Sequence, residues 1–180
     1  MDSEFLQPED ILGPEGRIAA RLTNYEHRMQ QLEMADAVAV ALADKCHLVV
    51  EAGTGVGKSF AYLVPAILAA TDPEAGTLET EDGEKRNRRI VISTHTISLQ
   101  EQLLGKDLPL LNSVIPREFS AVLVKGRANY LSQRRLKNAV KRSGTLFEGE
   151  QELEQLDLIN QWAKETTDGS RSTLPFQPIP

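Results

Sequence analysis

The sequence predicts an α/β fold in which a parallel sheet is covered by helices. Three short apolar segments have the β-branched composition typical of buried strands: 47–52, 89–94 and 120–125. Around them, apolar residues recur at three- and four-residue spacing, which predicts helices over 27–44, 58–70, 97–104, 130–142 and 150–165. Strands and helices alternate along the chain, and this order is typical of a parallel sheet with helical crossovers.

Composition is that of an ordinary globular protein. The 180 residues are 41% hydrophobic and 26% charged, which argues against a disordered or collagen-like chain. A net charge of −6 argues against general affinity for polyanions but not against a local basic groove. The single cysteine, Cys46, excludes an internal disulfide framework. No apolar run approaches the roughly 20 residues needed to span a membrane, and the start MDSEF is not typical of a signal peptide, so a cytoplasmic protein is expected.

Three segments lie outside the predicted core. Residues 1–24 hold turn residues around a short apolar stretch and are interpreted as a lead-in. Residues 71–88 are rich in charge, with Pro and Gly, which predicts a solvated, mobile loop. The turn-rich residues 167–180 predict a flexible tail.

The strongest chemical signal is the sequence AGTGVGKS at 52–59, between the first predicted strand and a predicted helix. Glycines there let backbone N–H groups turn toward phosphate oxygens, and the helix N-terminus adds positive potential. Lys58 is expected to reach the β- and γ-phosphates and the Ser59 hydroxyl to bind Mg²⁺, so these two are the candidate catalytic residues. The other interpretation is a glycine-rich turn that merely precedes a helix. The candidate ATP-binding residues of the loop are Ala52, Gly53, Thr54, Gly55, Val56, Gly57, Lys58 and Ser59.

Ala52, in place of a leading glycine, makes this loop resemble that of superfamily 2 helicases. Three further segments resemble the DinG/XPD family of DNA helicases: YEHRMQQLEM at 25–34, ISTHTISLQEQL at 92–103 and KGRANYL at 125–131. The resemblance implies a three-layer RecA-like P-loop NTPase sheet, of which 25–126 would form the amino-terminal part of helicase domain 1. It also implies ATP and Mg²⁺ as cofactors, single-stranded DNA as a partner, and a helical insert at 127–166 equivalent to the family's iron–sulfur region.

Two of these segments supply further candidate residues. In the family, the segment before the phosphate loop reads adenine, which makes Arg28 and Gln31 ATP-binding candidates, because they are three residues apart on a predicted helix. Without the loop beside them, the two would be interpreted as a solvated helix face. The 92–103 segment resembles a strand end that contacts the DNA backbone, and gives Thr94, Thr96 and Gln100 as DNA-binding candidates. A helix N-cap at Thr94 or Thr96 is compatible with that role.

In the family, KGRANYL continues to a cysteine that binds an iron–sulfur cluster, but Ser132 stands here and no cluster is expected. The surrounding residues 119–147 contain Lys and Arg but no Asp or Glu, which suits contact with a nucleic-acid strand. The alternative is a solvated helix face paired with the acidic helix that follows. The candidate DNA-binding residues here are Lys125, Arg127, Tyr130, Arg134 and Arg135.

The resemblance therefore implies part of an ATP-dependent DNA helicase that couples Mg-ATP hydrolysis to translocation on single-stranded DNA and duplex unwinding, with DNA repair as a usual role. No apolar strand in the sequence ends in the acidic pair that hydrolysis needs, and the second RecA-like domain is missing. The chain alone is expected to bind nucleotide without hydrolysing it, with the missing helicase portion in the same or another chain. The alternatives are a non-catalytic nucleotide-binding module, or another P-loop ATPase or kinase that does not act on nucleic acid.

Overall fold

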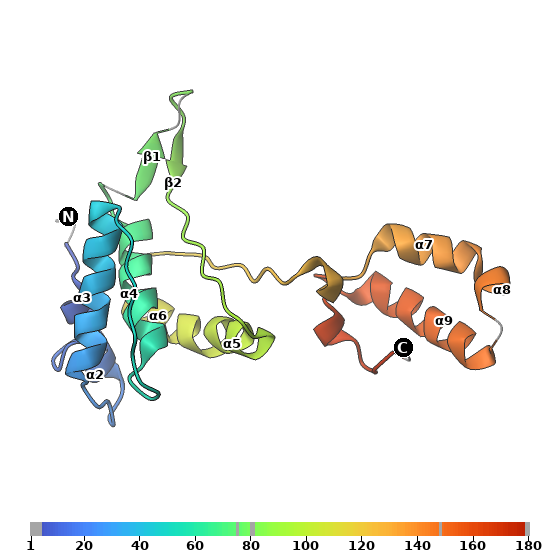
Figure 1. Ribbon diagram of the computed structural model, residues 1–180, viewed down its shortest axis with the longest axis horizontal. Helices are drawn as coiled ribbons and strands as arrows, with labels where there is room; N and C mark the ends of the chain where they lie inside the picture. The colour runs from blue at the N-terminus through green and yellow to red at the C-terminus, as the bar shows by residue number, and fades with distance from the viewer. Residues whose placement is uncertain (1–4, 75, 80–81, 148, 179–180) are drawn as a thin grey trace. The chain divides into compact units, whose positions relative to one another are not determined.

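The computed structural model describes residues 5–74, 76–79, 82–147 and 149–178. The chain divides into two compact units, Met1–Leu123 and Val124–Pro180. Figure 1 shows the helices of both units. No helix in the described part of the chain combines the length and the apolar character that crossing a membrane requires.

Helices α3 (Met29–Asp44) and α4 (Lys58–Ala70) form the centre of the first unit and lie side by side (Figure 1). The predicted helix at 58–70 is confirmed at both ends, and the helix predicted at 27–44 is confirmed except for its first two residues. The short helix α1 (Pro8–Leu12) packs onto this pair, and α2 (Arg17–Arg21) packs onto α1. Apolar burial at this contact stabilises the unit. The described apolar side chains of this unit with less than 2% exposure are Ile11, Leu12, Ile18, Ala35, Ala61, Leu63, Val64, Pro65 and Leu111.

A second helical layer of this unit begins after the segment at 89–96. Helix α5 (Ile97–Gln102) continues through a π-helical turn, η1 (Leu103–Asp107), into α6 (Leu108–Val114). The prediction of a helix at 97–104 is confirmed for its first six residues. Leu103, Leu111 and Val114 bury this layer against the same core as α4.

The predicted α/β fold with its parallel, three-layer RecA-like sheet is wrong for this structure. Among the described residues the strands are β1 (Thr77–Glu79) and β2 (Lys85–Asn87), which pair antiparallel with each other. The segments 47–52, 89–94 and 120–125, all within the described residues, form no strand, and Val49, Val91 and Val122 are 97%, 90% and 84% exposed. A β-branched composition shows only that a segment suits an extended backbone, whereas parallel pairing requires hydrogen bonds from distant segments, and here those bonds do not form.

The β1–β2 hairpin lies within the segment 71–88 that was predicted to be a mobile loop. Thr77 is opposite Asn87, and Leu78 is opposite Arg86. The backbone N–H of Arg88 donates to the Gly76 carbonyl at 2.7 Å and closes the base of the hairpin. Part of the predicted loop, residues 75, 80 and 81, lies outside the described residues.

The second unit is built on α7 (Gln133–Lys141) and α9 (Glu150–Glu165), joined by the short α8 (Ser143–Leu146). The helix predicted at 150–165 is confirmed at both ends, and that predicted at 130–142 is confirmed over its centre. Leu136, Leu156 and Trp162 form the buried side chains of these helices. Two 3₁₀ turns, η2 (Arg127–Asn129) and η3 (Arg171–Thr173), complete the unit.

Candidate functional site

The candidate phosphate loop, residues 52–59, connects an extended segment to the first turn of α4. Gly55 and Gly57 have φ angles of +85° and +86°, in the left-handed region that favours glycine. Gly57 is the N-cap of α4 and no side chain caps that helix, so its first N–H groups have no helical acceptor. A Cβ atom added at Gly53 would meet no atom within 4 Å. The loop therefore presents backbone donors beside open space.

Lys58, the first residue of α4, closes the loop on itself. Its Nζ donates to the carbonyl oxygens of Ala52 at 2.9 Å and Gly53 at 2.7 Å. The Lys58 side chain is exposed, so an anion can reach the ammonium group from solvent. Because a carbonyl is a neutral acceptor, a phosphate oxygen would compete favourably for the same protons.

Ser59, the predicted magnesium ligand, is partly buried and hydrogen-bonds with Tyr62 one turn further along α4. Burial raises the pKa of Tyr62 above its usual value, the hydrogen bond with Ser59 lowers it, and the negative charge of Asp107 raises it further. No group of three or more His, Cys, Asp or Glu side chains that could hold a metal ion is found in the described part of the chain.

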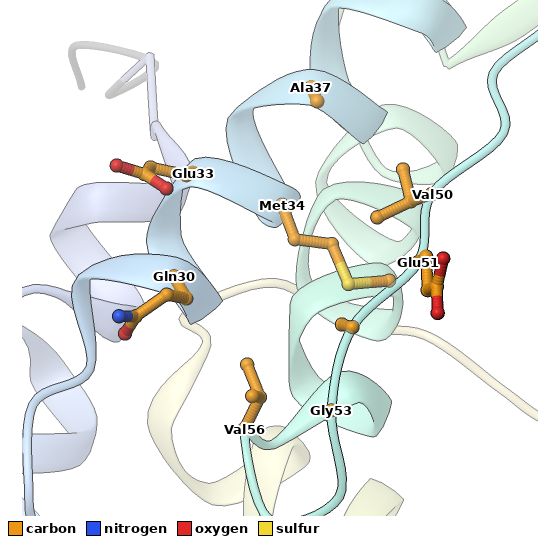
Figure 2. A pocket seen from close by; sticks show the side chains of 9 residues that line it. Gln30, Glu33, Met34, Ala37, Val50, Glu51, Gly53 and Val56 are labelled. Atoms are coloured by element: carbon orange, nitrogen blue, oxygen red, sulfur yellow. The ribbon is translucent and has the colours of Figure 1, made fainter.

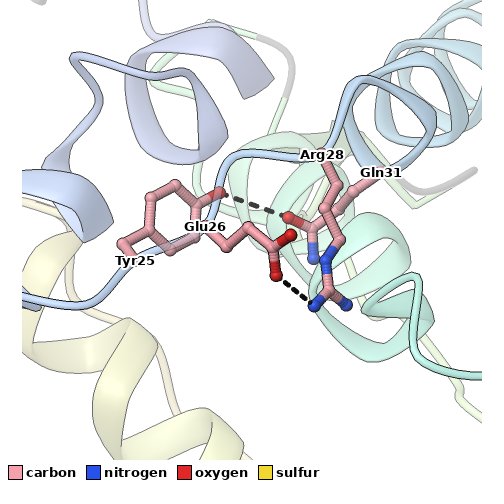
Figure 3. A network of polar contacts seen from close by, with 4 residues as sticks. All are labelled: Tyr25, Glu26, Arg28 and Gln31. Atoms are coloured by element: carbon pink, nitrogen blue, oxygen red, sulfur yellow. Dashed lines mark hydrogen bonds and ion pairs between the residues drawn. The ribbon is translucent and has the colours of Figure 1, made fainter.

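Gln31, on α3, is joined directly to the phosphate loop. Its Nε2 donates to the Gly57 carbonyl at 2.9 Å, although 26 residues separate them. The hydroxyl of Tyr25 lies 3.2 Å from Gln31 Oε1 and 2.7 Å from the Leu12 carbonyl, so its one proton is shared between two acceptors. Figure 3 shows the Tyr25–Gln31 contact and the side chains around it. The structure thus brings Gln31 to the loop through its amide.

Arg28 also lies at the loop, but not as the predicted helix-face partner of Gln31. It is the N-cap of α3, with an extended backbone, and its guanidinium pairs with Glu26 at 2.7 Å (Figure 3). The hydrogen bond and the positive charge of Arg28 hold the pKa of Glu26 below its usual value. A Cβ atom at Gly55 would lie 4.0 Å from the Arg28 guanidinium, which places this cation beside the loop.

A pocket of about 390 Å³ lies between α3 and the extended segment that enters the loop. In Figure 2, the Met34 side chain reaches from α3 toward that segment. Ala52, Gly53 and Val56 were candidates from the sequence, but the other lining residues were not. Those residues are Gln30, Glu33, Met34, Ala37, Val50 and Glu51.

The three candidates at 94–100 lie at the start of α5. Thr96 is the N-cap of that helix, and its hydroxyl accepts from the Leu99 backbone N–H at 3.3 Å, which confirms the N-cap interpretation for Thr96. The Thr94 hydroxyl donates to the Thr96 carbonyl at 3.2 Å. Thr96 is exposed and Gln100 is partly buried, and both lie in the first part of α5, with Thr96 at its N-cap.

In the second unit, the candidates of the KGRANYL segment divide into buried and exposed residues. Lys125 is 8% exposed, and its Nζ donates to Ser170 Oγ at 3.3 Å and to Ser172 Oγ at 2.7 Å. The Lys125 backbone N–H donates to the Tyr130 hydroxyl at 2.9 Å. We refer to residues 125–130 and 169–173, which these bonds join, as the clasp. Arg127 is exposed.

The basic residues of α7 and of its C-cap form an exposed row on the same unit. The Ser132 hydroxyl accepts from the Arg135 N–H at 3.4 Å, so Ser132 caps this helix. None of the row's side chains forms an ion pair with a residue that the structure describes, acidic residues of α9 included. The row consists of Arg134, Arg135, Lys137, Lys141 and Arg142.

Most of this chain is similar in sequence to bacterial helicases. The ATP-dependent DNA helicase YoaA of Escherichia coli is 35% identical over 164 residues, which are 91% of this chain and 23% of YoaA. The ATP-dependent DNA helicase DinG of Photobacterium profundum is 37% identical over 158 residues, or 83% of this chain and 21% of that protein. The ATP-dependent helicase DinG of Mycobacterium tuberculosis is 38% identical over 172 residues, or 87% and 24%.

The chain is homologous to the DinG and YoaA ATP-dependent DNA helicases. The resemblance to the DinG family that the motifs indicated is therefore confirmed. The chain spans less than a quarter of the length of these DinG and YoaA relatives. No protein-family model matches it, and no solved structure matches it.

Proposed function

We propose that this chain forms the ATP-binding part of a DNA helicase that couples Mg-ATP hydrolysis to movement along single-stranded DNA and to duplex unwinding. The observation that carries the proposal is the phosphate loop. Gly57 holds a left-handed conformation at the uncapped start of α4, and the exposed Lys58 spans the loop. Homology to ATP-dependent DNA helicases supports ATP and DNA as the ligands.

The loop residues fit a polyphosphate. Bound ATP would supply the phosphoanhydride, and Mg²⁺ would neutralise phosphate charge and be held in part by the Ser59 hydroxyl. Lys58 would exchange the carbonyls of Ala52 and Gly53 for phosphate oxygens, while the first N–H groups of α4 donate to the same ligand. Arg28, already beside Gly55, adds positive charge at the rim of the site.

The exposed basic row on α7, together with Arg127, is the proposed contact with single-stranded DNA. These side chains are not neutralised by ion pairs with described residues, so they are free to exchange counterions for DNA phosphates. Thr94, Thr96 and Gln100 form a second proposed contact at the start of α5, where the exposed Thr96 suits a phosphate backbone.

Equilibrium binding of a fluorescent ATP analogue with Mg²⁺ tests the proposal. The wild-type chain should bind, and Lys58→Ala should weaken binding by about tenfold or more, because charge-assisted hydrogen bonds are lost. Lys106→Ala, which removes an exposed lysine of η1, is the matched control and should bind as the wild type does. Wild-type affinity in Lys58→Ala would exclude the loop as the phosphate site.

Hydrolysis measured in the same samples tests the second part of the proposal. We expect binding without turnover, because the sequence shows no apolar strand ending in the acidic pair that orients the attacking water. Turnover by the wild type that Lys58→Ala abolishes would show that the chain carries a catalytic acid of its own. A single-stranded oligonucleotide should bind at low salt and should lose affinity steeply as salt is raised.

A further inference from the structure

We propose that the second arm of the β1–β2 hairpin binds the phosphate backbone of double-stranded DNA, separately from the proposed single-strand contacts. This arm, residues 85–89, has the sequence KRNRR, and we refer to it as the basic arm. The choice of DNA as the polyanion rests on the proposed function, whereas the surface itself is a feature of the hairpin. Neither the phosphate loop nor the basic row of α7 includes any of its residues.

The hairpin separates its charges by sign along the chain. The first arm and the turn, residues 76–84, contain acidic residues and no Lys or Arg. The basic arm contains Lys and Arg at every position except Asn87, and no Asp or Glu. In a chain with a net charge of −6, binding of a polyanion requires a local concentration of cations such as this one.

Strand pairing holds the basic arm in an extended backbone. Leu78 lies opposite Arg86, and the Arg88 N–H donates to the Gly76 carbonyl at 2.7 Å, so the pairing continues past the end of β2. Side chains of a strand alternate between its two faces, which places Arg86 and Arg88 on one face, about 7 Å apart. That interval is comparable with the distance between neighbouring phosphates of a DNA strand. Figure 1 shows the two strands as a ribbon, and a two-stranded ribbon fits the major groove of B-DNA.

The arginines of the basic arm are accessible to phosphates. Arg86 and Arg89 are exposed, and Arg88 is partly buried. Arg86 pairs with Glu84 at 2.9 Å, and the two side chains are 66% and 65% exposed. An exposed ion pair of this kind contributes little to stability, so a phosphate can replace the carboxylate. Arg88 and Arg89 form no ion pair with any residue that the structure describes.

The composition of the hairpin favours double-stranded over single-stranded DNA. Residues 76–89 contain no Phe, Tyr or Trp, so the hairpin lacks the aromatic side chains on which the bases of a single strand stack. Its contacts would be with phosphates, and these lie about twice as densely along a duplex as along one of its strands. A surface that binds by charge alone therefore prefers the duplex.

Binding of labelled DNA to the full chain tests the proposal. A duplex and a single-stranded oligonucleotide of the same length are titrated by fluorescence anisotropy at several salt concentrations. Arg86→Gln combined with Arg88→Gln should weaken duplex binding by about tenfold at low salt and leave single-strand affinity unchanged. For the duplex, the slope of log affinity against log salt concentration should become shallower by about 1.8, as expected for two lost phosphate contacts. Arg21→Gln combined with Lys106→Gln, which removes two exposed cations elsewhere in the first unit, is the matched control and should bind both DNAs as the wild type does.

Glu84→Gln tests the same surface with a change of opposite sign. It releases Arg86 from its ion pair and removes a negative charge next to the basic arm, so duplex affinity should rise about two- to fivefold.

The outcomes separate this proposal from the proposed function. Wild-type duplex affinity in the double arginine variant would overturn the proposal, and so would an equal loss for both DNAs or no duplex binding by the wild type at low salt. If the wild type bound neither ATP nor single-stranded DNA, the proposed function would fail. Duplex binding that depends on Arg86 and Arg88 would still support the basic arm as a DNA contact.

Discussion

The buried ammonium of Lys125 should stabilise the second unit, and Lys125→Met tests this directly. Methionine keeps the length of the aliphatic stem and removes the charge, which donates to Ser172 at 2.7 Å and to Ser170 at 3.3 Å. Each hydrogen bond to a charged group contributes about 1.5–3 kcal/mol, but the substitution also removes the cost of burying an ammonium group. The two serine hydroxyls, 3.0 Å apart, retain each other as partners.

The net loss from Lys125→Met is therefore about 1–2 kcal/mol of unfolding free energy. Urea unfolding is followed by the fluorescence of Trp162, the one tryptophan of the chain, whose indole N–H donates to the Thr173 carbonyl in the same unit. The midpoint should fall by roughly 1 M urea. Lys137→Met, on the exposed face of α7, is the control and should change stability by less than about 0.5 kcal/mol.

A double-mutant cycle shows whether the effect arises from the serines. Lys125→Met is combined with the paired substitutions Ser170→Ala and Ser172→Ala, and the coupling free energy should be about 1 kcal/mol or more. Unchanged stability in Lys125→Met would refute the reasoning, because a buried ammonium with two acceptors would then contribute nothing net. Destabilisation without coupling would assign the effect to the packing of the stem.

Three further predictions concern the loop, its tyrosine and the basic row. Gly57→Ala should lower the unfolding free energy in urea by about 2–3 kcal/mol, because it combines a left-handed backbone with a collision between the new Cβ atom and Gln31. Gly83→Ala, at φ +76° in open space, should lower it by about 1 kcal/mol. Equal losses in the two variants would exclude an effect of the collision. Burial raises the pKa of Tyr25, and the positive charge of Arg28 partly opposes this shift. The contribution of Tyr25 to stability is therefore complete below the ordinary tyrosine pKa and is lost as pH rises through the folded-state pKa. Above about pH 10 the urea midpoint should fall less with pH in Tyr25→Phe than in the wild type, and an equal fall in both would contradict this. The double substitution Arg134→Ala and Arg135→Ala should weaken single-stranded DNA binding. The slope of log affinity against log salt concentration should become shallower by about 1.4, as expected for two lost phosphate contacts. An unchanged slope would show that the row is only a solvated helix face.

The sequence predicted helices well and strands badly, for a physical reason. Helix α4 begins at Lys58 and ends at Ala70, as the spacing of its apolar residues predicted. A helix forms its backbone hydrogen bonds between residues four apart, so local composition and capping residues contain most of the information needed to predict it. The segment 89–94 has an equally clear strand composition, yet Val91 is 90% exposed and unpaired. Its pairing would depend on other segments, which local composition does not describe.

At the phosphate loop, the sequence predicted conformation better than contact. Glycine at position 57 was expected from the need for an unusual backbone, and the structure has φ +86° there. The contact with Gln31 was not predicted, because helical spacing places residues on a face without saying whether that face is buried. Arg28 also differs from expectation, since α3 begins one residue after it and its side chain pairs with Glu26.

Burial, which the sequence does not show, also separates the residues of the KGRANYL segment. Lys125 and Arg127 were both predicted to contact DNA, but they differ in burial. Lys125 and Arg127 are both cations, and either could contact a phosphate by residue type alone. In the clasp, Lys125 is 8% exposed and bonded to two serines, whereas Arg127 is exposed. If both alter DNA binding, Lys125→Met should act by loosening the second unit and leave the salt dependence unchanged. Arg127→Ala should leave stability unchanged and reduce the salt slope by about 0.7, as expected for one lost phosphate contact.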